Sequence, residues 1–420
     1  LVSLSAKEFV PGVAKAEEYA VGKNLFHKIG CLSCHESEQS VNLVHVPMKY
    51  GMDSLTAFLF QPLHTRPSGR MPDMNLTRDE ARSIAGYLIG MEGRGGLRLK
   101  PEAVKVAAGK KYFEQFNCAS CHKLPGIKAK PSLALGKLRV GKGCLSVQPK
   151  GMPHFYLSTA QRETIGKALK GIGKPLRDQV RIQQTMVAFN CIACHTRDGA
   201  GGVSNTMFTH FGTDEEGLGN PARIPPTLDG VGVKLKPEWL RKVLFDAETV
   251  RPYMHTRMPQ FGEENLQYLP MLLEKVDRLP KVEFREPKRD NRRKYREGGH
   301  LLVGDKGLNC VACHNFNGNP SPGLKGLDLL TSFERLQPSW FAHFMRNPQK
   351  FRPGIVMPNY WPGGEAVRKD VLGGNPNGQL LALWHYFSLG RSARDPSGIR
   401  AEGTDLKVTN RTRVYRGRSR

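Results

Sequence analysis

Eight of the nine cysteines in this 420-residue sequence occur in pairs, and two residues separate the members of each pair. A histidine follows every pair directly, so the pattern Cys-x-x-Cys-His occurs four times. The copies are Cys31, Cys34 and His35; Cys118, Cys121 and His122; Cys191, Cys194 and His195; and Cys310, Cys313 and His314. Two thiols at this spacing can form thioethers with the two vinyl groups of a porphyrin, and the adjacent imidazole can bind its iron. The sequence therefore predicts four covalently attached haems c, with the histidines as iron ligands.

A single Cys-x-x-Cys pair is also compatible with a zinc knuckle, a redox-active dithiol or half of a disulfide framework. Four copies, each with its histidine in place, favour haem attachment over these alternatives. Cys144 lies outside the pattern. We expect it to be a buried reduced thiol, with an intermolecular disulfide as the alternative.

A Met-Pro dipeptide follows each motif and supplies a candidate sixth ligand. These methionines are Met71, Met152, Met258 and Met357, which lie 36, 30, 63 and 43 residues after the histidine of their motif. A thioether on the iron raises the reduction potential and fills the sixth coordination position. We expect these four methionines to be axial ligands, and a packing role is the alternative. The nearest competitors, Met74 and Met254, lie outside the shared Met-Pro frame.

Histidine is the alternative sixth ligand. His64, His154 and His255 lie near three of the Met-Pro sites, but no histidine lies comparably close to Met357. Methionine is the one ligand type that serves all four sites by the same rule. The second site has the shortest interval, so we expect His154 to compete with Met152 there.

Other residues near the Met-Pro sites have types that suit a haem pocket. Arg66, Arg251 and Arg352 each begin an Arg-Pro dipeptide five to seven residues before the methionine. A guanidinium there can bind a haem propionate, and an exposed helix end is the alternative. Trp239 and Trp340 follow prolines at expected helix starts and can pack on a porphyrin or in an ordinary core.

Two helices are expected to flank each motif. The segments before the first two motifs, EYAVGKNLFHKIGC and VKVAAGKKYFEQFNC, place a glycine nine residues before the first cysteine, which permits close approach of another helix. The third copy lacks the glycine. The fourth, GGHLLVGDKGLNC, has about two inserted residues, so its helix is expected to end earlier. After the first two Met-Pro sites, LTRDEARSIAGYLIG and LSTAQRETIGKALKG begin with helix-cap patterns.

This repeat resembles class I c-type cytochrome domains, and the resemblance covers about residues 15–395. Segments such as PPTLDGVGVKLKPEWLRKVL followed by RPYMHTRMPQF are similar to the modular multihaem cytochromes of planctomycete-type bacteria. The resemblance implies a mainly α fold of four tandem class I cytochrome c-like haem domains with long loops. We place these domains, called modules one to four below, at 1–97, 98–172, 173–283 and 284–400, with a basic tail at 401–420. The basic stretch KVEFREPKRDNRRKYR between modules three and four is expected to be a solvated linker or docking surface.

The formal net charge is +25, of which haem propionates would offset about eight. Four haems argue against nucleic acid as the partner, so we expect acidic redox partner proteins, with a homo-oligomer or a larger assembly as further options. No apolar run reaches the roughly 18 residues of a membrane span, so no transmembrane segment is expected. Haem c is attached outside the cytoplasm, which implies export to the periplasm or the cell exterior.

These features together predict electron transport through four iron-containing haems rather than an enzyme, because both axial positions are expected to be filled. One alternative is a haem subunit of a respiratory complex or of an extracellular cytochrome filament. Another is a haem peroxidase or nitrite reductase, which would need a five-coordinate iron beside a distal acid or base. The sequence shows no such arrangement.

Overall fold

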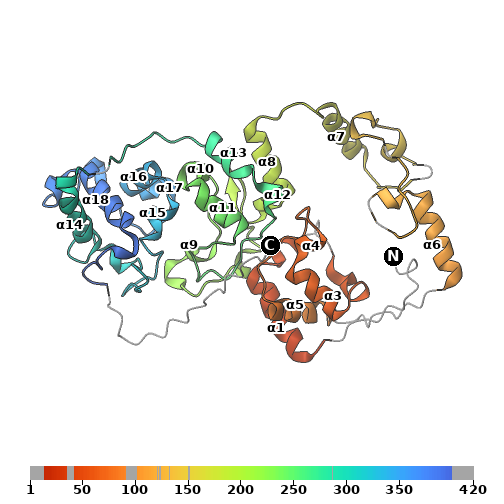
Figure 1. The fold of residues 1–420 in the computed structure, drawn as a ribbon, viewed down its shortest axis with the longest axis horizontal. Coiled ribbons are helices and arrows are strands. Elements are labelled where there is room, and N and C mark those ends of the chain that lie inside the picture. Colours follow the sequence, from red (N-terminus) through yellow and green to blue (C-terminus); the bar gives the residue numbers. More distant parts are fainter. Residues whose placement is uncertain are drawn as a thin grey trace. The chain divides into compact units, whose positions relative to one another are not determined.

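The computed structural model of this chain describes residues 14–35, 42–90, 102–120, 122, 124–131, 133–149, 152–285 and 287–399. Helices make up most of the regular elements, and the one sheet among these residues has two strands (Figure 1). The expected mainly α fold is confirmed. Cys121 and the basic tail 401–420 lie outside the described residues.

The chain divides into two compact units. The first unit comprises Leu1–Leu25, Val41–Leu59 and Thr77–Arg181, and the second comprises Phe26–Ser40, Phe60–Leu76 and Ile182–Arg420. The second Cys-x-x-Cys-His motif therefore belongs to the first unit, and the other three motifs belong to the second. The division into four haem domains stays a prediction.

The elements up to the third motif alternate α-helices with short 3₁₀ turns. They are α1 (Ala16–Ile29), α2 (Leu32–His35), η2 (Leu43–Met48), α3 (Met52–Phe60), α4 (Pro62–Thr65), α5 (Arg78–Ile89), α6 (Ala103–Gln115), η3 (Cys118–Ser120), η4 (Leu135–Lys137), η5 (Gly143–Leu145), α7 (Thr159–Lys170) and α8 (Asp178–Ala188).

The elements from the third motif onward all belong to the second unit. They are η6 (Cys191–Ala193), β1 (Thr196–Arg197), β2 (Ala200–Gly201), η7 (Phe208–His210), η8 (Glu216–Leu218), α9 (Asn220–Arg223), α10 (Val231–Lys234), α11 (Pro237–Phe245), α12 (Glu263–Leu266), α13 (Leu269–Val276), η9 (Arg289–Asn291), α14 (Arg292–Val303), η10 (Cys310–Ala312), α15 (Thr331–Arg335), α16 (Pro338–Arg346), α17 (Pro348–Phe351), η11 (Pro362–Gly364), η12 (Leu372–Gly374), α18 (Pro376–Ser388) and η13 (Gly390–Ser392). Strands β1 and β2 pair antiparallel.

Helices α1 and α5 meet at glycines in the first unit. A Cβ atom on Gly22 would lie 1.8 Å from the carbonyl oxygen of Ser83, and one on Gly86 would lie 2.8 Å from the Cβ of Glu18. Only glycine permits so close an approach of two helix backbones. The role expected for the glycine nine residues before Cys31 is therefore confirmed.

Capping boxes begin the helices that follow the first two Met-Pro sites. The side chain of Thr77 accepts a hydrogen bond from the backbone N–H of Glu80, and the Glu80 carboxylate accepts one from the backbone N–H of Thr77. Ser158 and Gln161 form the same reciprocal pair at the start of α7. Each box satisfies two backbone donors that the first helical turn leaves unpaired, so the caps predicted from the sequence are confirmed.

Helices α14 and α18 pack against each other in the second unit in the same manner (Figure 1). A Cβ atom on Gly299 would lie 2.4 Å from the carbonyl oxygen of Ala382. Gly299 precedes Cys310 by eleven residues, which equals the nine-residue spacing plus the two-residue insertion. Helix α14 ends at Val303, well before the cysteine, so the expected early end is confirmed. Trp361 and Tyr386 are fully buried in the core that these helices cover.

Module three has a core formed by α8, α10, α11, α12 and α13. A buried ion pair ties its sheet to the end of α13, because the Arg197 guanidinium donates to the Asp277 carboxylate at 2.6 Å. The same carboxylate accepts the backbone N–H of Gly232 at 2.7 Å, and Arg197 also donates to the carbonyl of Leu228 at 2.7 Å. These additional hydrogen bonds are what a buried ion pair needs to be tolerated.

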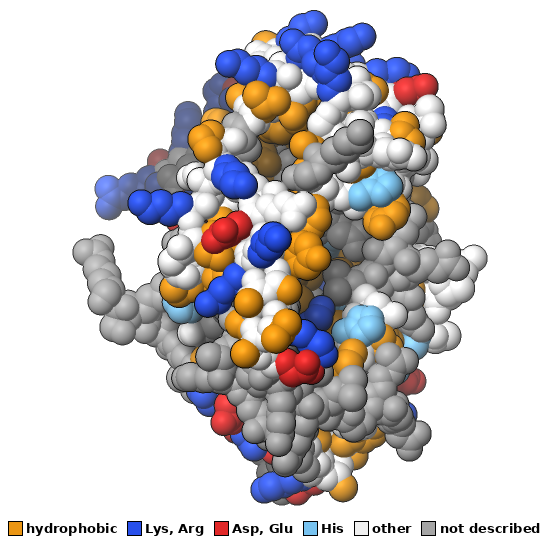
Figure 2. All heavy atoms as spheres, turned by 90° about the vertical axis from the view of Figure 1, so that its right-hand side faces the viewer, with side chains coloured by type: hydrophobic (Ala, Val, Ile, Leu, Met, Phe, Trp, Pro, Cys, Tyr) orange, Lys and Arg blue, Asp and Glu red, His pale blue; other side chains and the backbone are white. Residues whose placement is uncertain are grey.

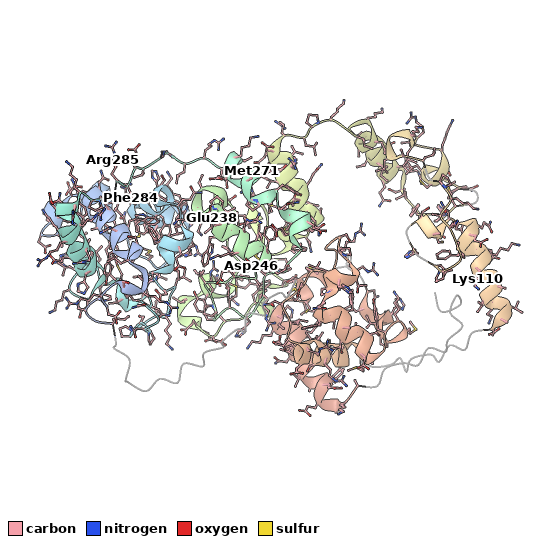
Figure 3. The ribbon with its side chains drawn as sticks, viewed as in Figure 1. Lys110, Glu238, Asp246, Met271, Phe284 and Arg285 are labelled. Carbon is pink, nitrogen blue, oxygen red and sulfur yellow. The ribbon has the colours of Figure 1, made fainter. Side chains whose placement is uncertain are left out.

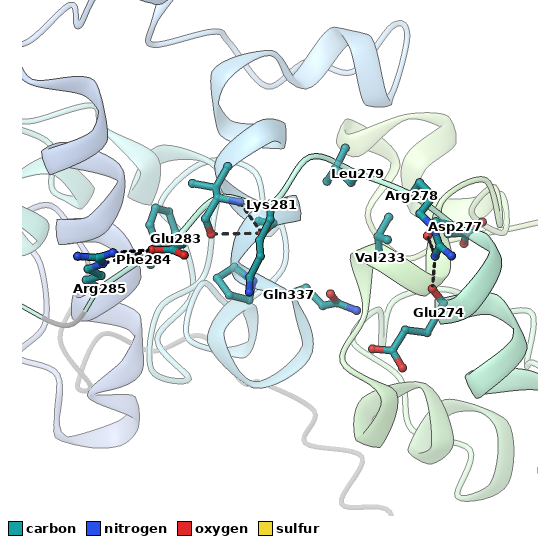
Figure 4. Close-up of a pocket in the computed structure, with 13 residues that line it drawn as sticks. Val233, Glu274, Asp277, Arg278, Leu279, Lys281, Glu283, Phe284, Arg285 and Gln337 are labelled. Carbon is teal, nitrogen blue, oxygen red and sulfur yellow. Dashed lines mark hydrogen bonds and ion pairs between the residues drawn. The ribbon is translucent and has the colours of Figure 1, made fainter.

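The chain between α13 and η9 packs against module four, contrary to the solvated linker expected for the start of the basic stretch. The backbone N–H of Val282 donates to Ser339 Oγ at 2.9 Å, and the Phe284 ring lies 6.0 Å from that of Trp384 (Figure 3). Apolar residues alternate with charged ones here, so Val282 and Phe284 are half-buried while Arg285 stays exposed. An open pocket of about 630 Å³ adjoins this segment and is lined by Val233, Gln337 and residues 277–279 and 281–285 among others (Figure 4).

None of the described helices has the length and apolarity needed to cross a membrane.

Candidate haem-attachment sites

All four Cys-x-x-Cys-His motifs share one backbone hydrogen bond. The backbone N–H of the motif histidine donates to the carbonyl of the first cysteine at 3.1, 2.9, 2.9 and 3.0 Å, in chain order. The residue before that cysteine has a positive φ in every copy: Gly30 at 107°, Asn117 at 53°, Asn190 at 54° and Asn309 at 55°. Glycine and asparagine are the residues that adopt this conformation most readily, so the turn is specified locally by the sequence.

The histidines of modules three and four have the orientation that a metal ligand needs. His195 Nδ1 lies 2.6 Å from the carbonyl oxygen of Pro226, and His314 Nδ1 lies 2.9 Å from that of Leu327. A carbonyl can only accept, so Nδ1 carries the proton and donates it, and Nε2 keeps its lone pair. Such a second hydrogen bond fixes the tautomer and the ring direction of metal-binding histidines.

Burial favours the neutral form of both imidazoles. It lowers the pKa of His195 and His314, and the nearby Arg251 and Arg335 guanidiniums act in the same direction, against the hydrogen bonds to the carbonyls. A neutral imidazole is the form that binds iron, because the lone pair on Nε2 must be free.

Burial favours the protonated form of several motif thiols. Burial raises the pKa of Cys31 and Cys310 to about 12, and that of Cys191 and Cys194 to about 11. A redox-active dithiol has the opposite character, with a lowered pKa and a reactive thiolate. The eight described cysteines are all free thiols, and among the described residues no group of three or more His, Cys, Asp or Glu can hold a metal ion.

The candidate methionines of modules three and four share a hydrophobic cluster with their motifs. Met258 packs against the cluster that Cys191 also contacts, and Met357 packs against the cluster that contains Cys310 and Trp340. All four candidates, Met71 and Met152 included, are half-buried. In modules three and four the structure therefore places the candidate methionine and the first motif cysteine at the same core, and iron ligation by the methionines stays a prediction.

The second motif is the least enclosed of the four. His122 is exposed, and Met152 lies near the turn of Gly143 and Cys144. His154 is exposed and stacks on Tyr156 with 4.2 Å between the ring centroids. Cys144 is half-buried rather than buried as expected, because apolar side chains of the surrounding loop, such as Leu135 and Val147, are themselves exposed.

The competing candidates near the other Met-Pro sites have different surroundings. His64 and Arg66 are exposed, whereas Met74 is buried. His255 Nε2 lies 2.7 Å from the carboxylate of Asp214. Trp239 and Trp340 are buried, and Trp340 stacks on Phe344 at 4.7 Å, so both tryptophans contribute to core packing.

The first and third motifs contact each other within the second unit. Asn190 Nδ2 donates to Cys34 Sγ at 3.7 Å, and Cys34 raises the pKa of both Cys191 and Cys194. The backbone N–H of Arg257, next to Met258, donates to the carbonyl of Ile29 at 3.0 Å. Residues 156 or more positions apart in the chain are thus neighbours, which no local pattern in the sequence indicates.

Comparisons with protein-family models, with curated proteins and with solved structures find no match for this chain. Its function is therefore inferred from its own residues: the hydrogen bond shared by the four motifs, the two oriented histidines and the raised pKa values of the thiols beside them.

Two kinds of residue near the motifs were missed by the sequence analysis. The acceptors for the histidines are the carbonyls of Pro226 and Leu327, which lie 101 residues apart in the chain. Lys234 and Arg335 have the same separation and belong to a group of half-buried cations with Arg251 and Arg352. An internal alignment of KLKPEW with RLQPSW at this offset would have found both.

Proposed function

We propose that this protein transfers electrons through four covalently bound haems c, each held by one Cys-x-x-Cys-His motif. The observation that carries the proposal is the orientation of His195 and His314, whose Nδ1 atoms are fixed by backbone carbonyls. That arrangement leaves Nε2 of each histidine free to bind iron, and each histidine directly follows the second motif cysteine. It supports haem attachment more strongly than the motif alone.

The chemistry of the surrounding residues fits a haem. The raised pKa values of Cys31, Cys191, Cys194 and Cys310 favour the protonated thiol, the form that adds across a vinyl group to give a thioether. Arg335 Nε is enclosed and has no hydrogen-bond partner among the described residues, which suits a site for an anionic group. Both features favour haem over a zinc knuckle, because zinc binds deprotonated thiolates and a zinc site needs no buried cation beside it.

Bound haem iron supplies one-electron exchange between its ferrous and ferric states. The protein residues bind and orient it: the motif cysteines fix the porphyrin edge, and the motif histidines provide the proximal ligand. Met71, Met152, Met258 and Met357 are proposed to fill the sixth position. No substrate chemistry belongs to this proposal, because a filled sixth position leaves no site for a peroxide or nitrite ligand.

The contact between the first and third motifs supports transfer from one site to another. Cys34 accepts a hydrogen bond from Asn190, the residue before Cys191, and raises the pKa of Cys191 and Cys194, so the cysteine sides of the two motifs face each other. Porphyrins attached there would approach each other at their thioether edges. We therefore propose that electrons pass directly between the first and third sites.

The proposed partners are acidic redox proteins in the periplasm or outside the cell. The net charge of +25 would attract such partners and speed their encounter. Figure 2 shows lysine and arginine side chains, interspersed with hydrophobic ones, on one face of the molecule. Membership of a respiratory complex or an extracellular filament remains the second proposal, which the mass of the native particle would distinguish.

Intact mass under denaturing conditions tests the proposed cofactor. Thioether bonds survive denaturation, so the mass is expected to exceed that of the polypeptide by four haems. Replacement of Cys191 and Cys194 by Ala is expected to remove one of the four and leave the others. Three or fewer haems in the wild-type protein would contradict the proposal.

A further inference from the structure

Modules three and four contact each other through equivalent residues. Leu235 pairs with Leu336 in an antiparallel bridge, and these two residues lie 101 positions apart. The backbone N–H of Lys236 donates to the carbonyl of Arg335 at 2.8 Å, and that of Gln337 donates to the carbonyl of Lys234 at 2.9 Å. Each hydrogen bond is the counterpart of the other, so the contact has local two-fold symmetry.

Four cations cluster around this contact, and they too form equivalent pairs. Lys234 corresponds to Arg335 and Arg251 corresponds to Arg352, at the same separation of 101 residues. Burial lowers the pKa of Arg251 and Arg335 to about 10. The charge of Arg251 also lowers the pKa of Arg335, and the charge of Arg335 lowers the pKa of Lys234. Burial also brings the pKa of Lys234 well below its usual range. The four charges therefore lie close enough to repel one another.

No carboxylate of the described chain forms an ion pair with any of the four. The Arg251 guanidinium donates to the carbonyls of Pro221 and Ile224 at 3.0 and 3.2 Å, and the Lys234 ammonium lies 4.9 Å from the centre of the Trp340 ring. Arg335 Nε is enclosed without a partner among the described residues. The nearby Glu215 pairs with Lys325 at 3.7 Å. Buried like charges without counter-ions are unfavourable, so the cluster calls for an anion.

The cluster lies between the third and fourth motifs. The charge of Arg251 acts on His195, and the charge of Arg335 acts on His314. Arg251 and Arg335 also act on each other, which connects the surroundings of the two histidines. One cation of each module therefore reaches the proposed proximal ligand of its own haem, and all four meet at the contact between modules.

We propose that Lys234, Arg251, Arg335 and Arg352 form one anion-binding site, shared by modules three and four, that binds the propionate carboxylates of both their haems. The inference rests on the proposed function, because the propionates arrive with the haems. Propionates lie on the edge of a porphyrin opposite to its thioether bonds. Haem three would then have haem one at its thioether edge and haem four at its propionate edge, which makes it the central member of a three-haem row.

If haems three and four share the same positive charges, one substitution in the cluster is expected to affect both haems. A buried positive charge disfavours the ferric state of any haem close to it, so its removal lowers the reduction potential. Because the cluster is shared, Arg335→Gln is expected to shift the steps of both haem three and haem four to lower potential. The steps of haems one and two are expected to stay unchanged.

The test is an optical redox titration of the complete haem-loaded protein, carried out for wild type, Arg335→Gln and Arg352→Gln. The steps of haems three and four are assigned with Met258→His and Met357→His, since imidazole stabilises ferric iron more than a thioether does. Arg66→Gln is the matched control, because Arg66 begins the equivalent Arg-Pro dipeptide of module one but is exposed. Arg335→Lys keeps the charge and is expected to titrate like the wild type.

A shift of two steps in both glutamine variants, with none in Arg335→Lys or Arg66→Gln, is the expected result. A shift of one step or none, in protein that carries four haems by mass, would overturn the shared site. A two-step shift in Arg335→Lys as well would show that the shift comes from a structural change rather than from loss of charge, and it would also overturn the shared site. Failure of the proposed function would appear separately, as fewer than four haems in the wild type.

Discussion

Modules two and four contain the same motif turn but enclose it to different extents. His122 and His314 both donate their backbone N–H to the carbonyl of the first cysteine of their motif, yet His122 is exposed and His314 is half-buried. The hydrophobic side chains buried in the described part of module two are Phe113 and Leu145, whereas module four has a cluster of twenty buried residues. The motif turn therefore forms from local sequence, while enclosure of the site depends on what the loop after it provides.

The loop lengths explain much of this difference. From the motif histidine to the Met-Pro methionine there are 30 residues in module two and 43 in module four. The longer loop includes Leu327, whose carbonyl orients His314, and the helices α15 and α16. In module two the described residues between the histidine and the methionine form short turns. Phe155 and Tyr156, which follow this methionine, are 59% and 84% exposed.

Among the tests of this comparison, removal of a buried aromatic ring is expected to change stability the most. Phe316 is fully buried and stacks on Tyr386 at 5.4 Å, so Phe316→Ala should reduce the stability of module four by about 3–5 kcal/mol. Phe155→Ala in module two should change stability by less than about 0.5 kcal/mol. Amide hydrogen exchange measured by mass spectrometry resolves α14 and α18 from α6 and α7. Equal effects in both modules would show that module two is as well packed as module four.

A glycine pair gives a smaller contrast. Gly299→Ala would place Cβ 2.4 Å from the carbonyl oxygen of Ala382, so α14 and α18 would have to separate, at a cost of about 1–3 kcal/mol. The control is Gly136→Ala in module two, where a Cβ atom meets nothing within 4 Å. The same exchange experiment should show faster exchange in α14 and α18 for the first variant and no change for the second. Unchanged exchange in Gly299→Ala would argue against the close helix crossing.

The smallest expected difference between modules two and four is in the rate of ligand exchange at their proposed haems. With a more open pocket, haem two should bind cyanide first, about tenfold faster than haem four, which corresponds to about 1.4 kcal/mol. It should also be the first to exchange its ligand at alkaline pH, with His154 as the competitor. Cyanide titration and resonance Raman spectra of wild type, Met152→Ala and Met357→Ala measure this order. If Met152→Ala leaves the spectrum of haem two untouched, His154 or Cys144 becomes its ligand candidate.

The sequence predicted the features that depend on local spacing. The glycine nine residues before Cys31 indicated the α1–α5 crossing, and the Thr77 and Ser158 caps were evident from their own helices. The hydrogen-bond partner of His195 was not predictable in this way. It is a backbone carbonyl, which every residue has, and the acceptors follow their histidines by 31 residues in one module and 13 in the other.

Long-range contacts also escaped the sequence analysis. Cys34 and Asn190 are 156 residues apart, so their contact follows from the packing of the second unit and from no periodicity in the chain. The half-buried cations were hidden for another reason: the equivalent positions hold Lys234 in one module and Arg335 in the other. Charge, rather than residue identity, is what the two modules share at this position.

The near-infrared absorption of the oxidised protein tests the central claim most directly, because a sulfur-to-iron charge-transfer band reports methionine ligation. At neutral pH the account predicts a band whose intensity corresponds to four methionine-ligated haems, and Met357→His should lower it by one quarter. Absence of the band in protein that carries four haems would contradict methionine ligation. Absence of the haems themselves would contradict the function proposed for the chain.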